Sequence, residues 1–134
     1  MNDTGHAVQE LFTRLGNWDA KGVSELFADS IDWGVPGSPA LAWTGARTTP
    51  DQVADFFNTM WNHFQTAESR AAVETIVVDG DDAAVFGSFD HVAKSTGKPF
   101  HTPFAMQVRV SGGRITRLHL YEDTLAVAQA FDAA

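Results

Sequence analysis

The chain has 134 residues, 44% of them hydrophobic, which is enough to bury a core and to leave room for an internal cavity. Seventeen acidic and nine basic residues give a formal charge of -8, which disfavours nucleic acid and anionic membrane surfaces as partners. The absence of cysteine excludes disulfides, thiolate nucleophiles and cysteine metal ligands. No stretch has the pattern of a signal peptide or a membrane span, so we expect one cytoplasmic domain over residues 1–134.

The N-terminal segment predicts two helices. Apolar residues with helical spacing follow a possible cap at Asp3 or Thr4; they are Val8, Leu11, Phe12 and Leu15. After Gly16, Asp19 can cap a second, shorter helix that runs to Phe27.

A short strand, a long loop and a third helix follow. The run "DSIDWGV" (29–35) predicts the strand, and the glycine- and proline-rich run 34–47 predicts the loop. Thr49, Pro50 and Gln52 predict a helix start. Thr49 and Gln52 can accept hydrogen bonds from the free amides of the first turn, and Pro50 suits the first helical position because it has no amide proton. The apolar stripe of this helix consists of Val53, Phe56, Phe57, Met60, Trp61 and Phe64.

From residue 71 onward the pattern changes to four strands and a short final helix. The strands are expected at 71–78, 83–93, 99–110 and 114–122, and the helix, capped by Asp123, at 124–131. The intervening turns "DGDD", "STGK" and "SGG" have the residues of hairpin turns. Helices segregated from an antiparallel sheet define an α+β fold.

The order of these elements and three segments resemble the nuclear transport factor 2-like superfamily. The segments are "LFADSIDW", "TGARTTPDQVADFF" and "GGRITRLHLYEDT". Within the superfamily, the chain over residues 5–131 is most similar to SnoaL-like polyketide cyclases and relatives of ketosteroid isomerase. The resemblance implies a cone-shaped α+β barrel, in which a curved antiparallel sheet packs on three N-terminal helices around an apolar pocket. It also implies a small hydrophobic ligand and a homodimer, whereas the chemistry varies within the family.

The positions that hold catalytic groups in family enzymes are apolar in this chain. By the resemblance, the ketosteroid isomerase base corresponds to Val35 and its tyrosine to about Leu11. Its oxyanion acid corresponds to Met106 or Ala105. The last-strand carboxylate of SnoaL-like cyclases and limonene-type epoxide hydrolases corresponds to Leu120. We therefore expect no isomerase of the usual Asp, Tyr and Asp type.

The turn at "STGK" bears on which side chains face a pocket. A two-residue turn at 96–97 would pair His91 with Thr102, on a face whose apolar character predicts burial. The other members of that face are Val85, Phe89, Phe104, Met106, Val108 and Val110.

The last strand has two possible registers. With a three-residue loop over 111–113, the buried residues are Leu118, Leu120 and Glu122. With a two-residue turn at 112–113, they are His119, Tyr121 and Asp123. We favour the first register, because it keeps both leucines with other apolar groups. It leaves His119 and Tyr121 under the sheet or at a dimer interface.

His91 and Glu122 are the candidate catalytic residues. A histidine at the end of an aromatic face could exchange a proton near neutral pH, and Glu122 could orient it or raise its pKa. The alternatives are a rim histidine bound to backbone or Thr102, and a solvated carboxylate at a strand end.

The expected substrate-binding surface is largely aromatic, although core packing is the alternative for each aromatic residue. Its candidates are Trp33, Val35, Trp43, Phe57, Trp61, Phe89, Thr102, Phe104, Met106, Leu118 and Leu120. These residues favour an apolar, cyclic or polyketide-like molecule, and Trp43 could act as a lid.

The sequence predicts neither a metal nor a cofactor, because the five histidines form no ligand motif. The leading hypothesis is a cofactor-independent isomerase, cyclase or dehydratase that acts by acid/base chemistry on a hydrophobic carbonyl compound. The alternatives are a non-catalytic binding module of the same fold and an epoxide hydrolase.

Overall fold

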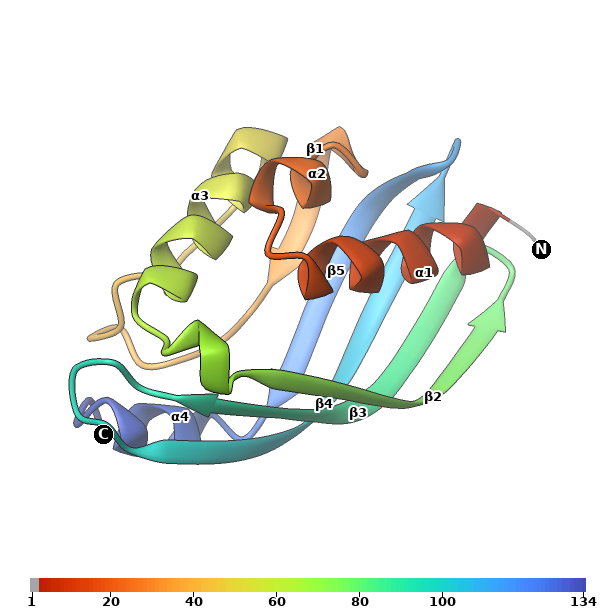
Figure 1. Ribbon diagram of the computed structural model, residues 1–134. Coiled ribbons are helices and arrows are strands. Elements are labelled where there is room, and N and C mark those ends of the chain that lie inside the picture. The colour runs from red at the N-terminus through yellow and green to blue at the C-terminus, as the bar shows by residue number, and fades with distance from the viewer. Residues whose placement is uncertain (1–2) are drawn as a thin grey trace.

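A curved five-stranded sheet wraps around helices on its concave side (Figure 1). The computed structural model describes residues 3–134. The helices are α1 (Asp3–Gly16), α2 (Ala20–Ser24), α3 (Pro50–Asn62), the 3-10 turn η1 (Thr66–Glu68) and α4 (Thr124–Ala130). The strands are β1 (Phe27–Gly34), β2 (Arg70–Asp79), β3 (Asp82–Val92), β4 (Pro99–Ser111) and β5 (Arg114–Glu122). The predicted α+β fold is confirmed.

The strand order is β1-β5-β4-β3-β2, and the sheet is mixed rather than purely antiparallel. β2 to β5 form the expected antiparallel meander, whereas β1 pairs with β5 in parallel. β1 also begins earlier than predicted, at Phe27, and α2 ends at Ser24. The reason is that the Leu26 carbonyl accepts a hydrogen bond from the Ile115 amide, so this backbone joins the sheet instead of a helix.

The predicted helix caps are present at α3 and α4. The Thr49 hydroxyl accepts from the Gln52 amide at 3.4 Å, while the Gln52 side-chain oxygen accepts from the Thr48 amide at 2.7 Å. Asp123 accepts from the Ala126 amide at 3.0 Å, so its carboxylate caps α4.

The β3–β4 hairpin differs in register from the prediction. His91 pairs with Phe100, and Thr102 pairs with Phe89. The connection is longer than two residues, because the Ala93 amide donates to the Lys98 carbonyl and the Gly97 amide to the Ala93 carbonyl. A shift of two residues leaves every side chain on its predicted face, so the faces were correct although the pairs were not.

The β4–β5 hairpin has the two-residue turn that we did not favour, but the inward-facing residues are those of the register that we favoured. Ser111 pairs with Arg114 across a two-residue glycine turn, which alone would turn His119 and Tyr121 inward. A β-bulge at Thr116 adds one residue to β5 and reverses the faces again. The inward residues are therefore Leu118, Leu120 and Glu122, opposite Val108, Met106 and Phe104.

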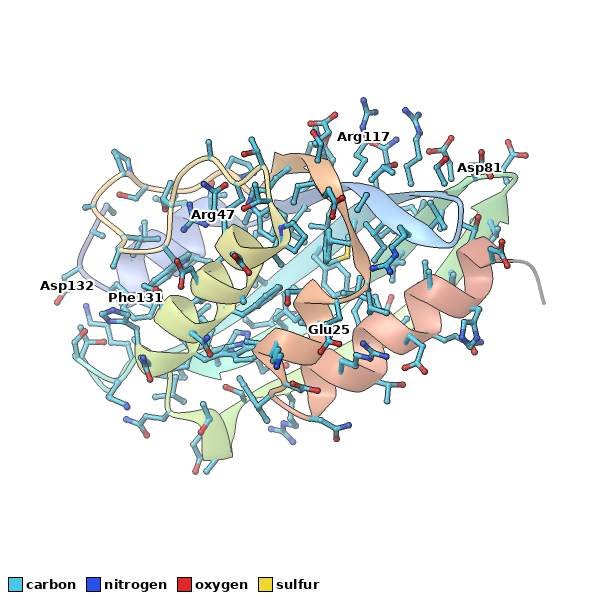
Figure 2. All side chains as sticks on the ribbon, turned by 90° about the horizontal axis from the view of Figure 1, so that it is seen from above. Glu25, Arg47, Asp81, Arg117, Phe131 and Asp132 are labelled. Carbon is cyan, nitrogen blue, oxygen red and sulfur yellow. The ribbon has the colours of Figure 1, made fainter. Side chains whose placement is uncertain are left out.

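The C-terminal segment closes one end of the cone. Phe131, after α4, packs edge-on against Trp43 at 5.1 Å and also contacts Phe64 and Phe100. Figure 2 shows Phe131 and Asp132 together at this end of the molecule. Within residues 3–134, no helix combines the length and apolar character that crossing a bilayer requires.

Candidate functional site

A cavity of about 400 Å³ lies between the concave face of the sheet and helices α1 and α3. All four tryptophans of the chain line it: Trp18, Trp33, Trp43 and Trp61. Phenylalanine side chains cover much of the remaining wall, namely Phe12, Phe56, Phe57, Phe64, Phe89 and Phe100. The volume suits a small organic molecule, and the wall is mostly apolar.

Most of the residues predicted to form the site line this cavity. They are His91, Glu122, Trp33, Val35, Trp43, Phe57, Trp61, Phe89, Met106, Leu118 and Leu120. Phe104 and Thr102 are buried but are not among the lining residues. The Thr102 hydroxyl instead accepts from the Asp123 amide at 2.8 Å, so Thr102 supports the end of β5 rather than the cavity wall.

Glu122 is a carboxyl group in an apolar wall. It lies on β5, two residues beyond Leu120, on the inward face. Burial raises its pKa to about 7, and the nearby Asp123 charge adds to this shift. A hydrogen bond with Thr102 opposes the shift but does not cancel it. Such a carboxyl group is partly protonated and partly ionised at neutral pH, which is the condition that suits a general acid or base.

His91 is a neutral imidazole held among aromatic rings. Its ring stacks on Phe64 with centroids 4.3 Å apart, and its Nδ1 atom lies 2.9 Å from the Ser69 hydroxyl oxygen. Burial lowers its pKa to about 4, although the neighbouring Asp90 charge acts in the opposite direction. At pH 7 His91 can therefore donate or accept a hydrogen bond, but it carries no charge.

His91 and Glu122 share the cavity without touching each other. His91 stands opposite Phe100 on β4, and Glu122 stands opposite Phe104, with β4 between their strands. Four residues along β4 and two strand spacings correspond to roughly 16 Å along the sheet surface. Thr102 lies between them in the pairing and does not bridge them. The side chains of His91 and Glu122 are therefore too far apart for Glu122 to orient His91 by direct contact, contrary to the expectation from the sequence.

The loop between β1 and α3 is fixed as one wall. Arg47 in this loop donates to the Trp43 carbonyl at 3.0 Å, and its guanidinium lies 5.6 Å from the centroid of Phe56 on α3 (Figure 2). Ser38 donates to the Ala133 carbonyl at 2.9 Å, which ties the loop to the C-terminal segment. Trp43 is buried, so in this structure it is part of the wall and not an open lid.

Several lining residues were absent from the sequence-based site. Ser69 and Trp18 are the most informative, because one contacts His91 and the other stands partly exposed beside Trp61. Ser69 lies in a turn without periodic pattern, so no sequence signal marks it. Trp18 carried a signal that could have been used, since a tryptophan between two helices in a turn is unusual.

The indole nitrogen of Trp33 is a buried polar atom in the aromatic wall. Within residues 3–134, its N–H has no hydrogen-bond partner. The ring is enclosed by Phe27, Phe56 and Phe57, with the closest centroid at 4.9 Å.

The opposite face of the sheet carries the other polar groups. Asp32 accepts from Arg117 at 2.8 Å and lies 2.8 Å from His119, and Asp90 lies 2.9 Å from His101. This arrangement agrees with the predicted outward direction of His119. In the described part of the chain, no group of histidine and carboxylate side chains is arranged to hold a metal ion.

The SnoaL-like domain model matches residues 8–118. The chain belongs to the SnoaL-like family. No curated protein matches it. The family assignment confirms the resemblance to SnoaL-like proteins that the sequence analysis described.

Solved structures support the same fold. A nuclear transport factor 2-like protein of unknown function from Burkholderia pseudomallei is 23% identical, with a TM-score of 0.86, over 97% of this chain and 98% of that chain. A proposed isomerase from Bacillus subtilis is 18% identical, with a TM-score of 0.79, over 100% and 98%. TerC, crystallised with polyporic acid, is 17% identical, with a TM-score of 0.84, over 98% and 99%. At these identities the likeness establishes the fold alone.

Proposed function

We propose that this SnoaL-like protein is a cofactor-independent enzyme that moves a proton on a small apolar carbonyl compound. Isomerisation, cyclisation and dehydration all share this first step. The observation that carries the proposal is Glu122, a carboxyl group in the wall of an aromatic cavity whose pKa is raised to about 7. The fold of TerC and of a proposed isomerase is consistent with it.

In this proposal Glu122 acts as base and then as acid. Its ionised form takes a proton from the carbon next to a carbonyl group, the C–H bond breaks, and the electron pair moves onto the carbonyl oxygen. The protonated Glu122 then returns the proton to another carbon, or to a departing hydroxyl group that leaves as water. A carboxyl group with a pKa near the working pH can perform both steps.

The apolar residues at family positions restrict the substrate. Val35, Met106 and Leu120 supply no donor for an enolate oxygen, although they line the cavity. A substrate whose enolate is already stabilised by conjugation, such as an activated ketone, needs the least help from the protein. His91 would bind a second oxygen of the substrate, because it lies too far along the sheet to share the carbonyl group with Glu122.

Proton exchange tests this proposal directly. The protein would be incubated with 2-tetralone in D2O, and deuterium at the carbon between ring and carbonyl would be followed by NMR. We expect wild-type protein to accelerate exchange and Glu122→Gln to lose at least about 100-fold of this acceleration, the usual contribution of a general base. The control is Tyr121→Phe on the opposite face, which should retain full activity. Equal exchange by wild type and Glu122→Gln would contradict the proposal.

A non-catalytic binding module is the second candidate function. It is favoured by the apolar residues at the positions where family enzymes hold their catalytic groups. A binding module would show saturable affinity for 2-tetralone or larger cyclic ketones with no exchange. Epoxide hydrolysis through paired carboxylates is less well supported, because Glu122 is the one carboxylate among the described lining residues.

We also propose a homodimer that forms through the outer face of the sheet. Three apolar or aromatic side chains on or beside this face are unusually exposed: Tyr121 at 55%, Val77 at 52% and Phe86 at 43%. Isolated exposed apolar residues are normal, but these residues lie on the same side of neighbouring strands. A two-fold contact over this face would remove them from water.

A further inference from the structure

Trp18 occupies a backbone position that normally belongs to glycine. It follows α1, and its amide donates to the Leu15 carbonyl while the Asp19 amide donates to the Arg14 carbonyl. This pair of hydrogen bonds is the Schellman motif, whose C′ residue is left-handed and usually glycine. Trp18 has φ 55°, in that left-handed region. A bulky side chain there is a genuine outlier, and such strain is concentrated at ligand-binding sites.

The indole of Trp18 reaches the entrance of the cavity. It lines the cavity and meets Trp61 edge-on, with centroids 5.0 Å apart. Trp18 is 37% exposed, so part of its ring still faces water. Four other exposed lining residues lie near this junction or on the facing end of β2, namely Gly16, Arg70, Ala71 and Val73, and a fifth, Pro36, lies in the β1–α3 loop. Most of the exposed lining therefore lies between the α1–α2 junction and the start of β2, and we take this side as the cavity entrance.

We propose that Trp18 is a ligand-contacting residue that selects molecules with a flat aromatic face at the cavity entrance. The strained turn holds its indole beside Trp61 at the open end. The flat ring of a bound ligand that extends out of the cavity here can stack on the exposed part of the indole. This contact would bury the part of the indole surface that faces water in the free protein. This inference rests on the ligand binding that the proposed function also needs, but not on proton transfer.

Two rigid probes of different shape test the role of Trp18. 2-Hydroxyanthraquinone is flat and conjugated, whereas 1-adamantanol is globular and has no aromatic face. Calorimetry would measure both affinities for wild type, Trp18→Leu and Trp18→Phe. We expect Trp18→Leu to weaken anthraquinone binding roughly ten-fold, Trp18→Phe to stay within about three-fold, and adamantanol binding to change less than about two-fold in either variant.

A matched control is Phe86→Leu, which removes an exposed ring from the opposite face and should leave both affinities unchanged. Thermal melts would establish that each variant is folded. If Trp18→Leu does not fold, Trp18→Phe still tests the proposal, because an equal loss of affinity for both probes in that variant would contradict it. Equal weakening of both probes by Trp18→Leu would show that Trp18 only shapes the fold and would overturn the proposal. Failure of wild type to bind the anthraquinone would overturn it too. Binding of the probes by wild-type protein requires no proton transfer, so a failed exchange experiment leaves this inference standing.

Discussion

Glu122 on β5 lies opposite Phe104 on β4, and the bulge at Thr116 places it there. The glycine turn alone would direct Glu122 outward, because one residue of register exchanges the two faces of a strand. With the bulge, the only carboxyl group among the described lining residues enters an aromatic cavity and its pKa rises to about 7. A local irregularity of the hairpin therefore determines that a carboxyl group faces the cavity.

Glu122 and His91 should give opposite dependences of stability on pH. The pKa of Glu122 is raised in the folded state, so its contribution is present below about 4.5 and is lost as the pH rises through about 7. The pKa of His91 is lowered, so its contribution is present above about 6.5 and is lost as the pH falls through about 4. Between these limits the two effects partly cancel in the wild-type protein.

Single variants should reveal each effect in urea unfolding between pH 4 and 8. Glu122→Gln should be more stable than wild type at pH 8 by about 2 kcal/mol, since one pKa unit corresponds to about 1.4 kcal/mol and partial exposure reduces the effect. Its stability should rise from pH 4 to 6.5. His91→Gln should instead lose stability from pH 4.5 to 7. Parallel profiles for the two variants would contradict the assigned shifts.

The low pKa of His91 should depend on burial more than on its hydrogen bond. Burial is the cause that lowers this pKa, and Phe64 covers the ring at 4.3 Å. We expect Phe64→Ala to raise the pKa of His91 toward 6.5, whereas Ser69→Ala should change it by less than about one unit. NMR of protein with ¹⁵N-labelled histidine measures both values. Ser69→Ala should also alter which ring nitrogen carries the proton at pH 7. The reverse order of the two pKa changes would assign the shift to Ser69.

The glycine at position 87 should not tolerate a side chain. A Cβ atom there would lie 2.1 Å from the Ala72 carbonyl oxygen on the neighbouring strand, far inside van der Waals contact. Gly87→Ala should therefore lower the free energy of unfolding by about 3 kcal/mol or more, because rigid backbone must move. Gly16→Ala is the control, since its Cβ meets nothing within 4 Å and should stabilise α1 by about 0.5 kcal/mol. Similar stabilities of the two variants would show that the strands separate easily.

The proposed dimer can be tested by charge on the outer face. Tyr121→Lys together with Phe86→Lys should convert a dimer to a monomer in light scattering, because two like charges would meet their symmetry copies. Leu125→Lys is a matched control, since Leu125 is 59% exposed but lies on α4, away from this face. A wild-type monomer, or a dimer that survives the double substitution, would exclude this interface.

Much of the fold was predictable, because it follows from local patterns. Residues close together in the sequence predict the apolar stripe of α3 and its Thr49 cap. They also predict the four strands after residue 70 and the Asp123 cap of α4. The registers were harder. The β3–β4 connection has more residues than a two-residue turn, and turn composition alone does not fix loop length. The bulge at Thr116 did leave a sign, since the apolar positions Ile115 and Leu118 have opposite parity.

The site was predictable only in outline. An aromatic, apolar cavity follows from composition and from the helix and strand faces. The separation of His91 from Glu122 does not, because it depends on a register difference of two residues in each of the hairpins β3–β4 and β4–β5. Ser69 and Trp18 enter through turn geometry, which sequence periodicity does not describe. The missing information was therefore the register between neighbouring strands and the geometry of the turns, which the pattern within a single strand does not give.

Titration of the Glu122 carboxyl group measures whether the cavity wall holds an acid/base group at neutral pH. Protein labelled with ¹³C at glutamate Cδ would be titrated from pH 3 to 9 by NMR, with Glu122→Gln used to assign the signal. We expect a midpoint near 7 for Glu122, because the apolar wall disfavours the ionised form. A midpoint near 4.5, the ordinary value for glutamate, would show a solvated carboxylate and would contradict the proposed acid/base function.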